Sequence, residues 1–145
     1  MTYPEDVIAP LRAEMVALGF DELRTPEAVD RFMAESGDGV ALLAVNSICG
    51  CAAGTMRPAL ARALSHPARP HRLGTVFAGH DVDATSRARG YFTGYAPSSP
   101  AVALYRRGEL ILMLERHHIK GQHPWLLAEQ LAAAVRQALG DEAAA

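Results

Sequence analysis

The stretch VALLAVNSICGCAAGTM, residues 40–56, decides the fold and contains both cysteines of this chain. Residues 40–46 form an apolar run without alternation, which is typical of a strand buried on both faces of a sheet. Residues 52–64 then carry apolar side chains at helical spacing. We therefore expect Cys49 and Cys51 to follow a buried strand at the start of a helix.

Composition and charge favour one globular domain, residues 1–145, that does not bind nucleic acid. Half of the residues are hydrophobic, and a chain of this length can bury roughly 70% of the surface that it exposes when unfolded. The formal net charge is -2 with both signs interspersed, so no basic field is available to hold a phosphate backbone. We expect the scattered arginines to lie on a solvated face; they are Arg57, Arg62, Arg69, Arg72, Arg87 and Arg89.

The N-terminal sequence and the hydropathy pattern favour a cytoplasmic protein with no membrane partner. Residues 1–15 are acidic and contain proline, and they lack the cationic start and apolar run of a secretory signal. No apolar stretch approaches the ~20 residues that span a bilayer. Because thiols are kept reduced in the cytoplasm, a close cysteine pair there is more often catalytic, redox-sensing or metal-binding than structural.

The remaining pattern predicts an α/β fold. The N-terminal part has two helix signals, and in the second of them Thr25 is the expected cap and Pro26 the first helical residue. Beyond the first strand, we expect a buried strand over 73–79, a weaker helix over 83–92, a hairpin over 101–114 and a last helix over 123–140. This order predicts a mixed four-stranded sheet flanked by helices, with an N-terminal helical extension over 1–36 and a core over 40–140.

Their placement makes the two thiols a candidate redox site. Ligands of open α/β sheets gather at the carboxyl ends of strands, and a helix start offers unpaired N–H groups and the positive end of the dipole. Both features favour the thiolate, which is the nucleophile. A disulfide between Cys49 and Cys51 needs a sharp turn, which Gly50 permits. Such a small ring is expected to be strained and oxidising, as suits a pair that cycles between its redox states.

Three alternatives to a redox role remain open. Free cysteine often behaves as a small buried hydrophobe. Two thiolates and two histidines could hold zinc, although no second ligand pair has a characteristic spacing. The histidines of the chain are His66, His71, His80, His117, His118 and His123. The third alternative is an inert interaction module with an apolar surface, which would function normally with both cysteines replaced by serine.

Two blocks of the sequence resemble the bacilliredoxin family of thioredoxin-like proteins. They are VNSICGCAAGTMRP, residues 45–58, and VFAGHDVDATSRARGYFTGYAPSSPAVAL, residues 76–104. The resemblance covers nearly the whole chain and includes ERHHIKG, residues 115–121. It implies a thioredoxin-like fold in which Pro100 is a cis-proline that faces the thiols, with Ser99 before it.

The resemblance also implies the activity of a thiol–disulfide oxidoreductase that removes bacillithiol from mixed disulfides on proteins. Cys49 would be the nucleophile and Cys51 the resolving thiol. Asn46, Ser47 and Ser99 could donate hydrogen bonds near the sulfurs. No metal or organic cofactor is expected, and bacillithiol acts as a thiol co-substrate.

The partners implied by the resemblance are S-bacillithiolated client proteins, bacillithiol and a flavin-dependent disulfide reductase. A weak disulfide isomerase or reductase activity is the alternative within the family. Thioredoxin itself differs, because Ile48 stands here where thioredoxin has a tryptophan, and because only one residue separates the thiols. We expect a monomer or a weak homodimer.

Overall fold

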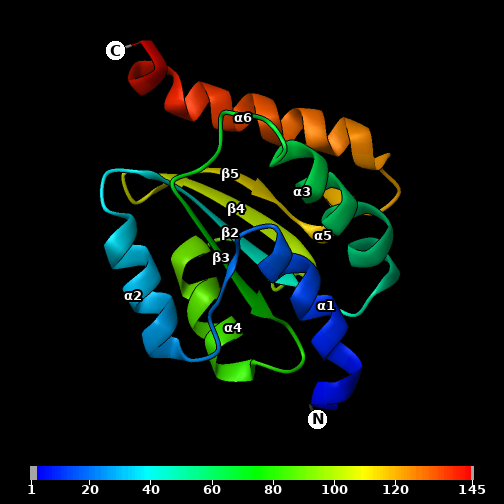
Figure 1. Ribbon diagram of the computed structural model, residues 1–145. Helices are drawn as coiled ribbons and strands as arrows, with labels where there is room; N and C mark the ends of the chain where they lie inside the picture. The colour runs from blue at the N-terminus through cyan, green and yellow to red at the C-terminus, as the bar shows by residue number, and fades with distance from the viewer. Residues whose placement is uncertain (1–2, 145) are drawn as a thin grey trace.

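The computed structural model describes residues 3–144 and contains a five-stranded mixed sheet with helices on both faces (Figure 1). In chain order the strands are β1 (Asp21–Glu22), β2 (Val40–Asn46), β3 (Arg72–Phe77), β4 (Ala101–Arg106) and β5 (Glu109–Leu114). Their spatial order is β1-β3-β2-β4-β5. Strands β1 and β2 run parallel to β3, whereas β2 pairs with β4, and β4 with β5, in the antiparallel direction.

The mixed α/β architecture is confirmed, but the expected number of four strands was wrong. The additional strand is β1, which pairs with β3 in the register Asp21↔Gly74 and Glu22↔Thr75. Two residues are too few to produce the alternation or the apolar run by which a strand is recognised in a sequence.

Four helices of the described chain lie in two pairs, and α1 lies at one end of the sheet (Figure 1). The helical elements are α1 (Glu5–Ala17), α2 (Pro26–Ser36), the π-helical turn η1 (Ala52–Met56), α3 (Arg57–Ala63), α4 (Val82–Arg89), the 3-10 turn η2 (Gly90–Phe92), α5 (Arg116–Ile119) and α6 (Pro124–Ala144). Helices α2 and α4 pack on one face of the sheet, and α3 and α6 on the other. No helix within residues 3–144 combines the length and the apolar character needed to cross a membrane.

Local sequence signals explain where α2 begins and where the last helix was expected to end. The Thr25 side chain accepts the N–H of Ala28 at 3.1 Å and Pro26 is the first helical residue, as predicted. Helix α6 was expected to end at Gly140, but it continues to Ala144. Glycine only weakens a helix by about 1 kcal/mol relative to alanine, so it need not end one.

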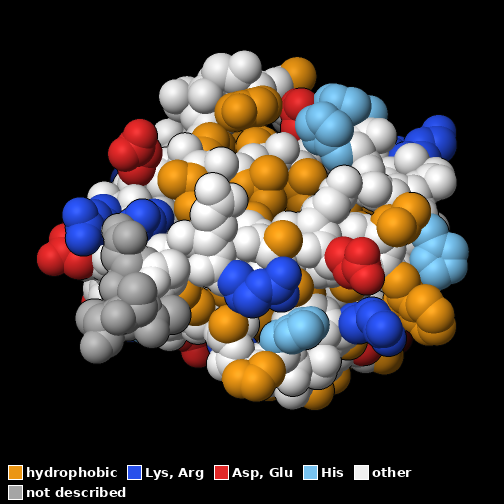
Figure 2. Space-filling model, turned by 90° about the horizontal axis from the view of Figure 1, so that it is seen from above, with side chains coloured by type: hydrophobic (Ala, Val, Ile, Leu, Met, Phe, Trp, Pro, Cys, Tyr) orange, Lys and Arg blue, Asp and Glu red, His pale blue; other side chains and the backbone are white. Residues whose placement is uncertain are grey.

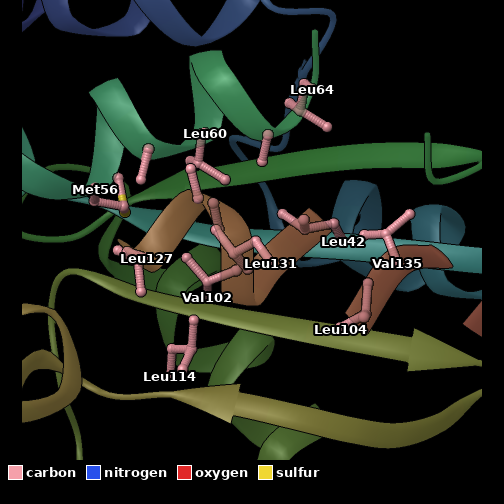
Figure 3. Packing of buried hydrophobic residues seen from close by; sticks show 14 of the residues in the cluster. Leu42, Met56, Leu60, Leu64, Val102, Leu104, Leu114, Leu127, Leu131 and Val135 are labelled. Carbon is pink, nitrogen blue, oxygen red and sulfur yellow. The ribbon is translucent and has the colours of Figure 1, made fainter. Parts of the chain in front are cut away.

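Alternate residues of the central strands belong to two separate cores. Leu42 of β2 and Leu104 of β4 pack with residues of η1, α3 and α6, and Figure 3 shows this cluster. Leu43 and Tyr105 belong to the other core, with residues of α2 and α4. Strand β2 is buried along its whole length, which explains why its sequence is a continuous apolar run.

Buried polar contacts hold α1 against the end of the sheet. Arg12 of α1 forms a bidentate ion pair with Asp81, at 2.9 and 2.7 Å, and each side chain is only 6% exposed. The Asp81 carboxylate also accepts the N–H of Phe77 at the end of β3. Asn46, at the end of β2, donates its side-chain amide to the carbonyl of Leu11 at 3.3 Å. Helix α1 is therefore fixed beside the segment that carries the cysteines.

Candidate active site

Cys49 and Cys51 lie in the connection between β2 and η1. Strand β2 ends at Asn46 and helical backbone begins at Gly50, so Cys49 directly precedes the helix and Cys51 lies in its first turn. Both thiols are free and half-buried, and both pack against the core formed with α3 and α6. The predicted placement between a buried strand and a helix start is confirmed.

Hydrogen bonds to sulfur make Cys49 more acidic than an ordinary thiol. Burial raises the pKa of Cys49, but the hydrogen bonds outweigh it, so that the pKa is lowered overall. The hydroxyl of Ser47 donates to the sulfur at 3.2 Å, and further donors are the backbone N–H groups of Ala52 and Cys51 and the Cys51 side chain. The Ser47 oxygen also accepts the N–H of Cys49 at 3.2 Å. A lowered pKa increases the fraction of nucleophilic thiolate at neutral pH.

Arg57 was expected on a solvated face but is buried instead. It is hydrogen-bonded to Ser47, whose hydroxyl donates to the Cys49 sulfur. Arg57 is 6% exposed and donates to the Asn46 side-chain oxygen at 3.0 Å and to the Ser47 carbonyl at 3.1 Å. The same Asn46 oxygen accepts the N–H of Ser47 at 2.9 Å. Glu14 of α1 forms an ion pair with the Arg57 guanidinium. Arg57 therefore fixes the strand end from which Ser47 reaches Cys49.

The sequence contains no signal that separates Arg57 from its exposed neighbour Arg62. Both are arginines of the same helical segment, and Arg57 is buried where it meets Glu14 of α1, Asn46 and Ser47. Asn46 and Ser47 were expected near the sulfurs, and the structure brings only Ser47 to a sulfur. Asn46 acts one step away, by bonding Ser47 and Arg57.

The peptide bond between Ser99 and Pro100 is cis, as the resemblance implied. Pro100 is buried and directly precedes β4. Because Val45 pairs with Ala101 in the antiparallel register of β2 and β4, Pro100 lies across from Asn46, where the cysteine segment begins. Among the hydrogen bonds of the described residues, none joins Ser99 to a sulfur. The expected donation from Ser99 is therefore not formed.

Gly50 does not need the conformational freedom of glycine in this structure. Its φ lies outside the left-handed region, and an added Cβ would meet no atom within 4 Å. The sharp turn expected between the cysteines belongs to a disulfide, whereas both thiols are free here. The structure thus describes the dithiol state of the pair.

The zinc site considered from the sequence is not formed by the described residues. In that part of the chain, no group of three or more potential metal ligands includes either cysteine. The group that does occur consists of Glu115, His117 and His118, whose ligand atoms lie within 4.8 Å of one another. Both histidines are exposed, as expected for this pair.

The surface over α6 and β5 is hollowed beside these histidines. A pocket of about 580 Å³ is lined by Leu112 and Leu114 of β5, by Ala134 of α6 and by His118, among others. Figure 2 looks onto this side of the molecule and shows hydrophobic side chains gathered there, with histidines beside them. Neither cysteine lines this pocket, so it is separate from the candidate active site.

Sequence comparisons relate nearly the whole chain to proteins of one family. The family model described as "Disulphide isomerase" matches residues 3–138. A protein of Cytophaga hutchinsonii named bacilliredoxin is 48% identical over 129 residues, which cover 89% of this chain and 94% of that protein. A bacilliredoxin of Halalkalibacterium halodurans is 48% identical over 135 residues, which cover 93% of this chain and 92% of the relative.

Structural comparisons find the same fold in more distant proteins. A thioredoxin of Malassezia sympodialis matches with a TM-score of 0.54 and 18% identity, over 82% of this chain and 90% of the thioredoxin. The protein Trxlp of Edwardsiella tarda matches with a TM-score of 0.53 and 20% identity, over 76% of this chain and 96% of Trxlp. The predicted thioredoxin-like fold is confirmed.

Proposed function

The chain belongs to the bacilliredoxin family, whose model is described as disulphide isomerase, and we propose that this thiol–disulfide oxidoreductase removes bacillithiol from mixed disulfides on client proteins. The observation that carries the proposal is the half-buried, free Cys49 sulfur that accepts the Ser47 hydroxyl hydrogen bond at the carboxyl end of β2. A thiolate stabilised in this way can attack a disulfide. The names of the relatives support bacillithiol as the small thiol.

In the first step, the Cys49 thiolate attacks the bacillithiol sulfur of the mixed disulfide. A new S–S bond forms between Cys49 and bacillithiol, and the S–S bond to the client breaks. The client cysteine leaves as a thiolate and takes up a proton from water, so it is reduced while Cys49 becomes oxidised. Before the attack, the hydroxyl of Ser47 stabilises the negative charge on the Cys49 sulfur.

In the second step, the Cys51 thiolate attacks the Cys49 sulfur and releases bacillithiol as a thiolate. The product is a Cys49–Cys51 disulfide. Its return to the dithiol needs two electrons, which a flavin-dependent disulfide reductase would supply. A second small thiol offers another route, because it can attack the mixed disulfide and leave with bacillithiol as a small-molecule disulfide. Neither route uses a metal or organic cofactor on this chain, and both fit a reducing, cytoplasmic setting.

A second candidate function is favoured by the description of the matched family. A weak disulfide isomerase or reductase would use the same two thiols on protein disulfides. The two candidates differ in substrate, because an isomerase should act faster on a scrambled protein disulfide than on a bacillithiolated client of similar size.

Mass spectrometry of the intact protein, incubated with a bacillithiolated client, tests the proposal. Cys51→Ser should accumulate one bacillithiol on Cys49, because the resolving step is blocked, while Cys49→Ser should acquire none. An adduct on Cys51 in the Cys49→Ser protein, formed at the wild-type rate, would reverse the two roles. A wild-type protein that leaves the client fully bacillithiolated would rule the function out.

A further inference from the structure

A small pocket adjoins the segment that leads to the cis-proline. It has a volume of about 340 Å³ and is lined on one side by Ala96, Pro97 and Ser98. Its other side consists of residues 115–117 and Lys120, in and around α5. The backbone N–H of Arg116 donates to the Ser98 hydroxyl at 2.6 Å, which joins the two sides.

The charges around this pocket are mostly positive and unpaired. Within the described residues, the side chains of Arg116 and Lys120 form no hydrogen bond or ion pair. Arg89 donates to the Ser98 carbonyl at 3.4 Å, and its Nε is a buried donor without a partner. The pocket's carboxylate belongs to Glu115, and it is already engaged as the N-terminal cap of α5 and lies 3.8 Å from His117. Arg116 and Lys120 therefore have no anionic partner in this pocket.

The strand register brings the segment that lines this pocket and the segment that carries the thiols to the same end of the sheet. Ser98 lies two residues before Pro100, and Pro100 lies across from Asn46 at the end of β2. A second contact joins the helical turn after the cysteines to the segment after α5. The hydroxyl of Thr55, in η1, donates to the carbonyl of Gln122 at 3.4 Å. A small molecule joined to Cys49 therefore starts at the sheet end from which residues 96–98 lead to Arg116 and Lys120.

We propose that this pocket binds the carboxylates of the small thiol that Cys49 receives. The inference rests on the proposed function, and it adds a binding site for a carboxylate-bearing thiol. Bacillithiol carries carboxylates on its malate portion, and these would pair with Arg116 and Lys120. Pairing at the pocket orients the small thiol, so that its sulfur and not the client sulfur faces Cys49.

The test compares two adducts of one client peptide, joined either to bacillithiol or to uncharged 2-mercaptoethanol. In the Arg116→Gln/Lys120→Gln protein, removal of bacillithiol should slow about three- to tenfold, and removal of 2-mercaptoethanol should be unchanged. The matched control is Arg136→Gln, because Arg136 is an exposed cation that does not line this pocket, and it should slow neither adduct. Equal slowing of both adducts, or unchanged rates, would overturn the proposal.

Malate, which has no thiol, tests the site separately from the redox chemistry. In nuclear magnetic resonance titrations of the reduced protein, malate should shift the backbone amide signals of Arg116 and Lys120, and the double variant should lose this response. No shift in the wild-type protein would overturn the site. Shifts in a wild-type protein that transfers neither adduct would support the site and reject the proposed function.

Discussion

Arg57, Asn46 and Ser47 form a short chain of hydrogen bonds that ends at the sulfur of Cys49. Arg57 contacts both the Asn46 side chain and the Ser47 carbonyl, and the Ser47 hydroxyl donates to sulfur. A hydrogen bond in a protein contributes about 0.5–1.5 kcal/mol net, and one unit of pKa corresponds to about 1.36 kcal/mol. A single well-aimed hydroxyl is therefore enough to change the reactivity of this thiol.

Replacing Arg57 by methionine should raise the pKa of Cys49, because the Ser47 hydroxyl would no longer be held as firmly toward the sulfur. The guanidinium does not touch the sulfur, so its effect passes through the Ser47 backbone that it holds. The thiolate can be followed by its ultraviolet absorbance during a pH titration. Arg62→Met is the matched control, because Arg62 is an exposed cation on the same helix, and it should leave the titration of Cys49 unchanged.

A double-mutant cycle separates this positioning role from a general loss of stability. Ser47→Ala removes the hydroxyl donor directly, so it should raise the pKa of Cys49 in the same direction. If Arg57 acts through Ser47, Arg57→Met should add almost nothing in the Ser47→Ala background. Fully additive shifts would mean that Arg57 acts on the thiol by another route.

The residues of the site differed in how far the sequence could predict them. Cys49 and Cys51 could be found because two thiols between an apolar run and a helix start form a local pattern. The cis bond before Pro100 could be expected only through the resemblance, since proline alone leaves trans the commoner state. Arg57 could not be found, because its burial depends on α1, which is distant in the sequence.

At the scale of elements, the helix that follows the cysteines begins irregularly. In η1 the backbone N–H of Arg57 reaches back to the carbonyl of Ala52. Pro58, which has no N–H, is then the second residue of α3, where no such donor is required. The π-helical turn thus accommodates a proline that would break a continuous α-helix.

Close packing of α2 on β3 should make Gly74→Ala destabilising. A Cβ at residue 74 would lie 2.8 Å from a Phe32 ring carbon and 2.9 Å from a Leu23 methyl carbon. Overpacking of this kind costs about 1–3 kcal/mol of unfolding free energy. Urea unfolding of the reduced protein measures this loss as a lower midpoint.

Gly54→Ala is the matched control for that substitution. Gly54 lies in η1, and an added Cβ there would meet no atom within 4 Å. We expect its unfolding midpoint to be equal to that of the wild type or slightly higher, because alanine favours helical backbone. Equal midpoints for the two variants would show that the contact of α2 with β3 is looser than described.

Elements with strong local patterns were predicted, and those that depend on tertiary pairing were not. Strands β2 and β3 and the hairpin of β4 and β5 follow apolar runs, and α2 follows its Thr25–Pro26 start. Strand β1 has two residues and exists because β3 pairs with it. The π-helical turn was not predicted either, because helical periodicity in a sequence does not separate a π-helical turn from an α-helix.

At the scale of the whole molecule, the sheet brings distant parts of the chain to one edge. The end of β2, the start of β4 and the end of β5 share that edge, because Val45 pairs with Ala101 and Val102 with Leu114. Helix α1 closes one side through the Arg12–Asp81 ion pair. The thiols, the cis-proline and the pocket beside α5 therefore lie at the same end of the sheet.

The pH dependence of bacillithiol transfer to Cys49 tests the account most directly. The measurement uses the Cys51→Ser protein, in which the introduced serine hydroxyl can still donate toward the Cys49 sulfur. It follows formation of the bacillithiol adduct on Cys49, with a bacillithiolated client as the donor. Raising the pH converts Cys49 to thiolate, so the rate should rise and level off. Because the pKa of Cys49 is lowered, the midpoint should fall below that of free cysteine titrated under the same conditions. A midpoint at or above that value, or an equal rate in the Cys49→Ser protein, would contradict the account.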